Sequence, residues 1–251
     1  GDEAGKKGGE NAGVSFAKKM LKIIAAAEIG KKVVEGIKAS VEAGAALEQS
    51  IGGIETLFKE SSDTMIQYAN NAFRTCGLSA NDYMETTTSF AASMLSSVGG
   101  DTAKAAELSN NALIAMSDNA NKMGTNMQDI QNAYQGFAKQ NYTMLDNLKL
   151  GYGGTKEEMQ RLLSDANKLN KQQGIITDYS IDSFADITEA IQVVQDNLGI
   201  TGTTALEAAS TLSGSFGTMQ AAWTNFIAKL SVGNQDQVNQ AMMDLASSAS
   251  T

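Results

Sequence analysis

Apolar and small residues recur at alternating steps of four and three along the N-terminal part of this chain. Over residues 14–48 this spacing is typical of one face of a long amphipathic helix of the coiled-coil type. The glycines and alanines in the series would let a partner helix approach closely. The series is Phe16, Met20, Ile23, Ala27, Gly30, Val34, Ile37, Val41 and Gly44, of which we assign Ile23, Val34, Ile37 and Val41 to a packing or oligomer seam.

A second apolar series follows the pair Gly52-Gly53, which we interpret as a hinge because glycine leaves the backbone flexible. The series stops before Gly77, a residue suited to the left-handed cap at a helix end. The pattern therefore predicts a helix over 52–76 that is separate from the helix over 14–48.

Polar capping residues mark the starts of the later helices. Each is a side-chain acceptor for the free amides of a first turn, and most have an acidic residue three positions on. These residues are Ser79, Asp101, Thr125, Thr155, Ser183 and Thr204. We predict an all-α fold, a multi-helix bundle with glycine hinges and coiled-coil-like seams. Its helices are expected near 14–48, 52–76, 79–97, 101–123, 125–140, 155–173, 183–198, 204–231 and 235–249, with a short helix and a glycine loop over 142–154.

A long uncharged stretch lies near the C-terminus, where residues 208–228 include 21 residues without a charge. As a helix it would be long enough to cross about 30 Å of hydrocarbon. Serine, threonine, glutamine and asparagine occupy its other faces, which favours an amphipathic packing helix over membrane insertion. The predicted packing or oligomer seam of this helix consists of Leu212, Phe216, Met219, Trp223, Phe226 and Leu230.

Composition narrows the possible chemistry. Proline and histidine are absent from all 251 residues, whereas glycine occurs 24 times. Helix breaks must therefore be made by glycine and polar caps, and a Ser-His catalytic pair is impossible. The single cysteine, Cys76, cannot form an internal disulfide, and we interpret it as a small buried apolar residue near a helix end. We expect no enzyme activity and no cofactor.

The net charge of −9 is unevenly distributed. Residues 1–47 carry 8 lysines against 6 acidic residues, whereas residues 48–251 carry 11 basic against 22 acidic residues. This acidic balance argues against nonspecific nucleic-acid binding by the larger part.

Two local patterns could carry ligand chemistry. The loop Gly151-Tyr152-Gly153-Gly154 opens a predicted helix in the manner of a phosphate cradle, but the following Glu157 and Glu158 would repel phosphate. Four acidic residues would share one face of a continuous helix, where we favour a solvated acidic face over a metal site. They are Asp178, Asp182, Asp186 and Glu189.

Five phrases together strongly resemble the core region of phage tail tape-measure proteins from long-tailed phages and prophages of Gram-positive bacteria. The resemblance covers residues 48 to 230, in the order found in the family, and no single phrase is specific alone. The phrases are GGIETLF (52–58), LSANDYMETTTSFAASML (78–95), GGDTAKAAELSNNALIAMSDNANKMGT (99–125), IQNAYQGFAKQNYTMLDNLKLGYGGTKEEMQRLL (130–163) and GITGTTALEAASTLSGSFGTMQAAWTNF (199–226).

The resemblance implies a structural virion protein whose helical length sets the length of the tail and templates tail tube assembly, and which is released during genome ejection. It implies tail tube, tail tip and tail assembly chaperone proteins as partners, self-association with a trimer as one option, and no specific nucleic acid. The protein would reside in the virion tail, and in the host cytoplasm during assembly. Family members are longer, so we expect this chain to be a fragment or a processed form.

The resulting domain prediction is a flexible leader over 1–13, the coiled-coil-like helix over 14–48, a tape-measure core over 49–231 and a C-terminal helix over 232–251. We expect the isolated chain to be compact and the assembled form to be extended. The alternative hypothesis is a membrane-active helical protein, or an ejection conduit, acting through residues 208–228. Membrane contact in a tape-measure protein would be limited to ejection.

Overall fold

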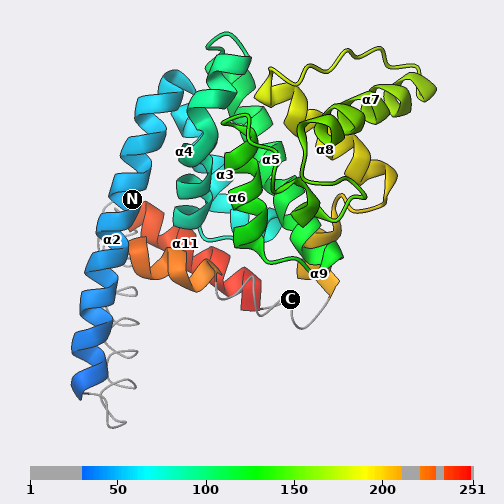
Figure 1. Ribbon diagram of the computed structural model, residues 1–251. Helices are drawn as coiled ribbons and strands as arrows, with labels where there is room; N and C mark the ends of the chain where they lie inside the picture. The colour runs from blue at the N-terminus through cyan, green and yellow to red at the C-terminus, as the bar shows by residue number, and fades with distance from the viewer. Residues whose placement is uncertain (1–29, 211–220, 230–234, 250–251) are drawn as a thin grey trace.

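The computed structural model describes residues 30–210, 221–229 and 235–249, and Figure 1 shows their arrangement. These residues form α-helices and two short 3-10 helices, with no strand among them, which confirms the all-α prediction. Residues 221–229 are also helical. The labelled elements are α2 (Gly30–Phe58), η1 (Lys59–Ser61), α3 (Ser62–Thr75), α4 (Ala80–Ser97), α5 (Thr102–Met123), α6 (Met127–Phe137), η2 (Leu145–Leu148), α7 (Lys156–Gln172), α8 (Phe184–Asn197), α9 (Thr203–Ser210) and α11 (Gln235–Ala249).

Four of the predicted capping residues cap the helices assigned to them. The hydroxyl of Ser79 accepts the Asp82 amide at 3.1 Å at the start of α4. Asp101, Thr155 and Ser183 accept amides in the first turns of α5, α7 and α8 in the same way. These bonds satisfy amides that have no partner inside the helix, so the start of each helix is set locally.

The predicted start of a helix at Thr125 is wrong. The amide of Thr125 donates to the carbonyl of Ala120 at 3.1 Å, next to Gly124, which closes α5 in a left-handed conformation. Because Thr125 belongs to the end of α5, α6 begins at Met127, two residues later than predicted. Asn126 is its capping residue and accepts the Gln128 amide at 2.8 Å.

The predicted hinge at Gly52-Gly53 is also wrong, since α2 runs through both glycines without a break. A Cβ placed on Gly53 would lie 3.2 Å from the Cγ2 atom of Thr88, on α4. The missing side chain therefore serves a close approach of two helices. The chain turns instead at η1, where Lys59 has a φ of 48°.

The centre of the bundle is formed by α4 and α5, whose fully buried side chains include Tyr83 and Leu113. In Figure 1, α2 lies along one side of this centre, and α7 and α8 form a hairpin on the opposite side. The rings of Phe90 in α4 and Phe184 in α8 lie 5.6 Å apart and join the hairpin to the centre. The predicted short helix within 142–154 is confirmed as η2, followed by the glycine loop.

Candidate functional site

The structure places only part of the predicted packing seams. Val34, Ile37 and Val41 belong to the N-terminal turns of α2, which extend away from the other helices in Figure 1. In the helical segment 221–229, Phe226 is 9% exposed and Trp223 is 41% exposed, with their rings 5.6 Å apart. The remaining predicted seam residues lie outside the described residues: Ile23, Leu212, Phe216, Met219 and Leu230.

Segment 221–229 packs against α3 and the start of α4 through small and polar side chains. Ala221 and Ala222 are buried in a cluster with Phe73 of α3. The side-chain oxygen of Asn225 accepts the amide of Ala80, the first residue of α4, at 2.7 Å. The alanines allow a close helix contact, and Asn225 supplies an acceptor for a helix-start amide.

Asp118 makes a buried contact with the start of α9 that the sequence pattern does not predict. Its carboxylate is fully buried and accepts two backbone amides from the start of α9, those of Gly202 at 2.6 Å and Thr204 at 2.8 Å. The predicted cap at Thr204 is wrong: Thr204 lies within α9, and its amide donates to this carboxylate, 86 residues away in sequence. Residues on nearly every side of α5 are buried here, so periodicity could not single out Asp118.

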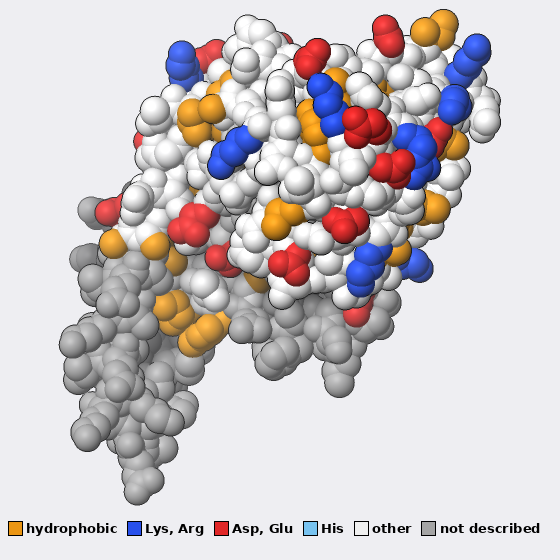
Figure 2. All heavy atoms as spheres, viewed as in Figure 1, with side chains coloured by type: hydrophobic (Ala, Val, Ile, Leu, Met, Phe, Trp, Pro, Cys, Tyr) orange, Lys and Arg blue, Asp and Glu red, His pale blue; other side chains and the backbone are white. Residues whose placement is uncertain are grey.

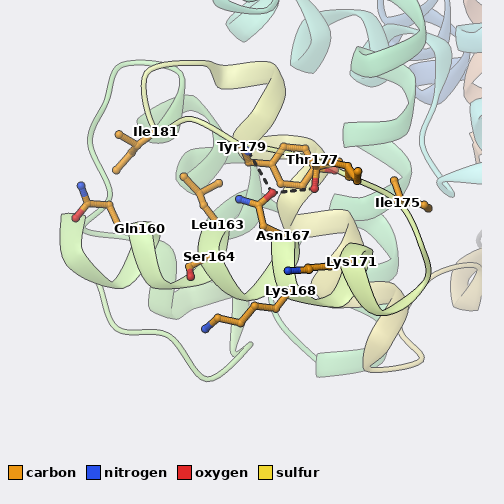
Figure 3. A pocket seen from close by; sticks show the side chains of 11 residues that line it. Gln160, Leu163, Ser164, Asn167, Lys168, Lys171, Ile175, Thr177, Tyr179 and Ile181 are labelled. Atoms are coloured by element: carbon orange, nitrogen blue, oxygen red, sulfur yellow. Dashed lines mark hydrogen bonds between the residues drawn. The ribbon is translucent and has the colours of Figure 1, made fainter.

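A groove of about 660 Å³ lies between α7 and the segment 174–181 that runs back along it. Figure 3 shows its polar anchor, in which Asn167 of α7 faces Thr177 and Tyr179. The side-chain oxygen of Asn167 accepts the Thr177 hydroxyl at 2.8 Å and the Tyr179 amide at 3.2 Å. Asn170 donates to both of these side chains at 3.1–3.2 Å, so two amide side chains hold the segment in place.

The groove combines apolar and basic side chains. Ile175 is 50% exposed and Ile176 is 95% exposed, and Lys168 and Lys171 of α7 line the same groove. Figure 2 shows orange apolar side chains beside blue basic ones at this end of the α7–α8 hairpin. Such a surface can hold an apolar side chain next to an acidic one.

The glycine loop before α7 is occupied by side chains of α7 itself. The amide of Gly153 donates to the Glu158 carboxylate at 2.9 Å, where a phosphate oxygen would lie in a cradle. Arg161 donates to Glu158 and to the Gly151 carbonyl, and its guanidinium lies 4.3 Å from the centre of the Tyr152 ring. The hydrogen bond from Arg161 is the main reason that the pKa of Glu158 is lowered to about 2.

The four acidic residues of 178–189 do not share a helix face, because α8 begins only at Phe184. Asp178 and Asp182 lie in the loop before it. The Asp186 carboxylate accepts the Ser180 amide at 2.8 Å, and Glu189 lies 3.9 Å from the Lys104 ammonium. No group of histidine, cysteine or acidic side chains suitable for a metal ion occurs among the described residues.

Cys76 lies at the C-terminal end of α3 and is buried, as predicted. Burial raises the pKa of its thiol to about 12, so the reactive thiolate is scarce at neutral pH. Its environment therefore matches a packing role.

In the parts of the chain that the structure describes, no helix has the length and apolar character needed to span a bilayer. Half of the uncharged run at 208–228 lies outside these parts, at residues 211–220.

Comparison with known proteins gave no match: neither a protein-family model, nor a curated protein, nor a solved structure is similar to this chain.

Proposed function

We propose that this chain is part of a phage tail tape-measure protein, a structural protein that helps to set tail length and templates the tail tube. The observation that carries the proposal is the ordered set of five phrases over residues 48–230. In chain order, the first three phrases correspond to the end of α2, to α4 and to α5. The fourth covers α6 through the first turns of α7, and the fifth includes α9 and part of segment 221–229. The resemblance thus concerns helix-forming segments throughout the packed body.

The helical architecture suits such a role. A helix rises about 1.5 Å per residue, so the 29 residues of α2 span about 44 Å. Helical length converts residue count into distance, which a molecular ruler requires. The described contacts are packing contacts, capping bonds and surface ion pairs, and we assign no catalytic step to them.

Within this proposal the helices exchange partners during assembly. The bundle buries its apolar faces within one chain, whereas in an assembled tail the same faces would be buried between copies or against tail tube and tail tip proteins. The projecting turns of α2 are the part we assign to self-association. Tail assembly chaperones would bind the chain before assembly, in the host cytoplasm, and the assembled protein would reside in the virion tail.

The proposal is tested in the phage or prophage that encodes the chain. One variant lacks the coding sequence for residues 48–230, and a matched control replaces it with an unrelated helical sequence of equal length. If those residues contribute extended helix to the ruler, deleting about 180 residues, each with a rise of 1.5 Å, should shorten the tail by about 270 Å. The control should restore the original tail length. Electron microscopy measures the tails, and mass spectrometry of purified tails shows whether the protein is present. Tails of unchanged length in the deletion variant would contradict the proposal.

The alternative hypothesis, membrane activity or an ejection conduit, rests on the uncharged run at 208–228. A peptide covering this run, added to liposomes loaded with a fluorescent dye, tests it directly. Leakage that depends on the peptide would favour the alternative. No leakage at any pH between 5 and 8 would remove it.

A further inference from the structure

The groove along α7 has a charge opposite to that of the protein as a whole. The chain carries a net charge of −9, yet among the described residues the charged side chains that line the groove are two lysines, Lys168 and Lys171. The ammonium of Lys168 lies 2.9 Å from the Asp165 carboxylate, which balances its charge. The Lys171 side chain is exposed and forms no ion pair in the described part of the chain. The groove therefore offers a positive charge to an acidic group.

Apolar side chains are exposed beside this charge. Ile175 is 50% exposed and Ile176 is 95% exposed, although isoleucine is among the residue types most often buried. Figure 3 shows Ile175 on the segment that faces Lys171 of α7. A side chain as exposed as Ile176 lies at the rim of the groove, where a ligand confined to the groove would leave it in water. A partner that covers Ile176 must extend over the rim, which a polypeptide does and a small molecule within the groove does not.

The segment 174–181 that carries the isoleucines is fixed along its length. Two amide side chains of α7 hold its middle, as described above. At its start, the amide of Ile175 donates to the Asn170 carbonyl at 2.9 Å. At its end, the Tyr142 hydroxyl donates to the Ile181 carbonyl at 3.2 Å. Because a segment that is already ordered loses little conformational entropy on binding, the exposed isoleucines are presented ready for contact.

The dimensions of the groove fit an extended peptide. The residues of α7 that line it run from Gln160 to Lys171, which at a rise of 1.5 Å per residue is a length of about 16 Å. Five residues of extended chain, at about 3.3 Å each, have the same length. The backbone amides of Ile176 and Thr177 donate to no acceptor among the described residues, so they are available to the carbonyl groups of such a peptide.

We propose that the groove between α7 and segment 174–181 is a docking site for an extended segment of a partner protein. This partner segment is about five residues long and has aliphatic side chains next to an aspartate or glutamate. Its carboxylate pairs with the Lys171 ammonium, and its aliphatic side chains cover Ile175 and Ile176. The proposal rests on the described contacts of the groove and does not depend on the function proposed above.

Selection from a displayed library of random seven-residue peptides, with the full 251-residue chain as the target, tests the docking site. Peptides that bind should share an aspartate or glutamate beside leucine, isoleucine or valine. Fluorescence polarisation then measures the affinity of a selected peptide. The affinity should fall about tenfold in Lys171→Glu, because an attraction becomes a repulsion. It should also fall about tenfold in Ile176→Ser, because the apolar area that the peptide buries is lost. A peptide whose acidic residue is replaced by lysine should bind Lys171→Glu better than the wild type.

The matched control is Lys156→Glu, because Lys156 is an exposed residue of the same helix that does not line the groove. It makes the same change in net charge and should keep the wild-type affinity. Ile176→Ser leaves every charge in place and alters an exposed side chain, so the test does not depend on one substitution folding. Selected peptides without the acidic and aliphatic pattern, or equal affinity in the wild type, Lys171→Glu and Ile176→Ser, would overturn the proposal.

Two other occupants of the groove would give different results. A second copy of the chain would form a dimer in sedimentation equilibrium that Ile176→Ser dissociates. A small amphiphile would be indicated if decanoate bound more tightly than every selected peptide and lost its affinity in Lys171→Glu. Either result would overturn the assignment of the groove to a segment of a partner protein.

Discussion

Gly154 lies directly against the backbone carbonyl of Thr143, so closely that a Cβ on Gly154 would overlap its oxygen. The contact joins the glycine loop before α7 to the segment before η2. Backbone atoms cannot move aside as the end of a flexible side chain can. A glycine is therefore required here by space.

Gly154→Ala should lower the free energy of unfolding by about 1–3 kcal/mol, the usual cost of forcing extra atoms into a packed site. Gly153→Ala is the matched control, since its Cβ would meet the Glu158 Cγ atom at 3.5 Å, an ordinary contact. Urea denaturation of both variants measures the difference. Equal midpoints would show that the loop moves freely away from Thr143.

Gly52→Ala should raise the free energy of unfolding by about 0.5–1 kcal/mol, because alanine loses less entropy in a helix and the added Cβ would have no atom within 4 Å apart from its chain neighbours and the backbone of its own helix. Gly53→Ala should raise the free energy of unfolding by less, since its added Cβ would lie only 3.2 Å from the side chain of Thr88. Thermal and urea unfolding of both variants provide the comparison. A loss of stability in Gly52→Ala would mean that α2 needs a hinge at this pair.

Arg161→Gln should return the pKa of Glu158 from about 2 toward its ordinary value near 4.5, because the guanidinium hydrogen bond is the main cause of the lowered pKa. A lowered pKa in the folded state stabilises the fold above pH 4.5, and that contribution is lost as the pH falls toward 2. Carboxyl NMR titration measures the pKa directly. Lys168→Gln is the control, because Lys168 pairs with Asp165. A Glu158 pKa that stays near 2 in Arg161→Gln would assign the shift to the Gly153 amide instead.

Asn167→Ala should destabilise the protein by about 1–2 kcal/mol and speed amide exchange across 174–181, because the Thr177 hydroxyl and the Tyr179 amide lose their acceptor. Gln160→Ala changes a side chain of the same groove that is exposed and forms no hydrogen bond among the described residues, and should stay within about 0.5 kcal/mol of the wild type. Unchanged exchange in Asn167→Ala would show that apolar contacts alone hold the segment.

Local signals in the sequence predicted the helix starts well. Ser79, Thr155 and Ser183 each bind an amide three residues away, so the interaction is complete within one turn and independent of the rest of the fold. The prediction for Thr125 was wrong because Thr125 lies between two helices and its amide donates to the last turn of α5. Asn126, the next residue, therefore caps α6 instead.

The groove along α7 and the contact between Asp118 and α9 could not be predicted in the same way. Asn167 and Thr177 are common polar residues, and nothing in their spacing says that the chain folds back along α7. The pairing of Asp118 with α9 spans 84 to 86 residues. Periodicity identifies the apolar face of a helix, but it does not identify the helix packed against it.

The sequence by itself determined that this chain is helical, where most helices begin, and that Cys76 is a packing residue, because propensity, capping and apolar period act over a few residues. Only the tertiary structure decided that Gly53 serves contact with Thr88 and that Asp118 caps α9. Those outcomes depend on which helices meet and how closely, and packing of the whole bundle determines both.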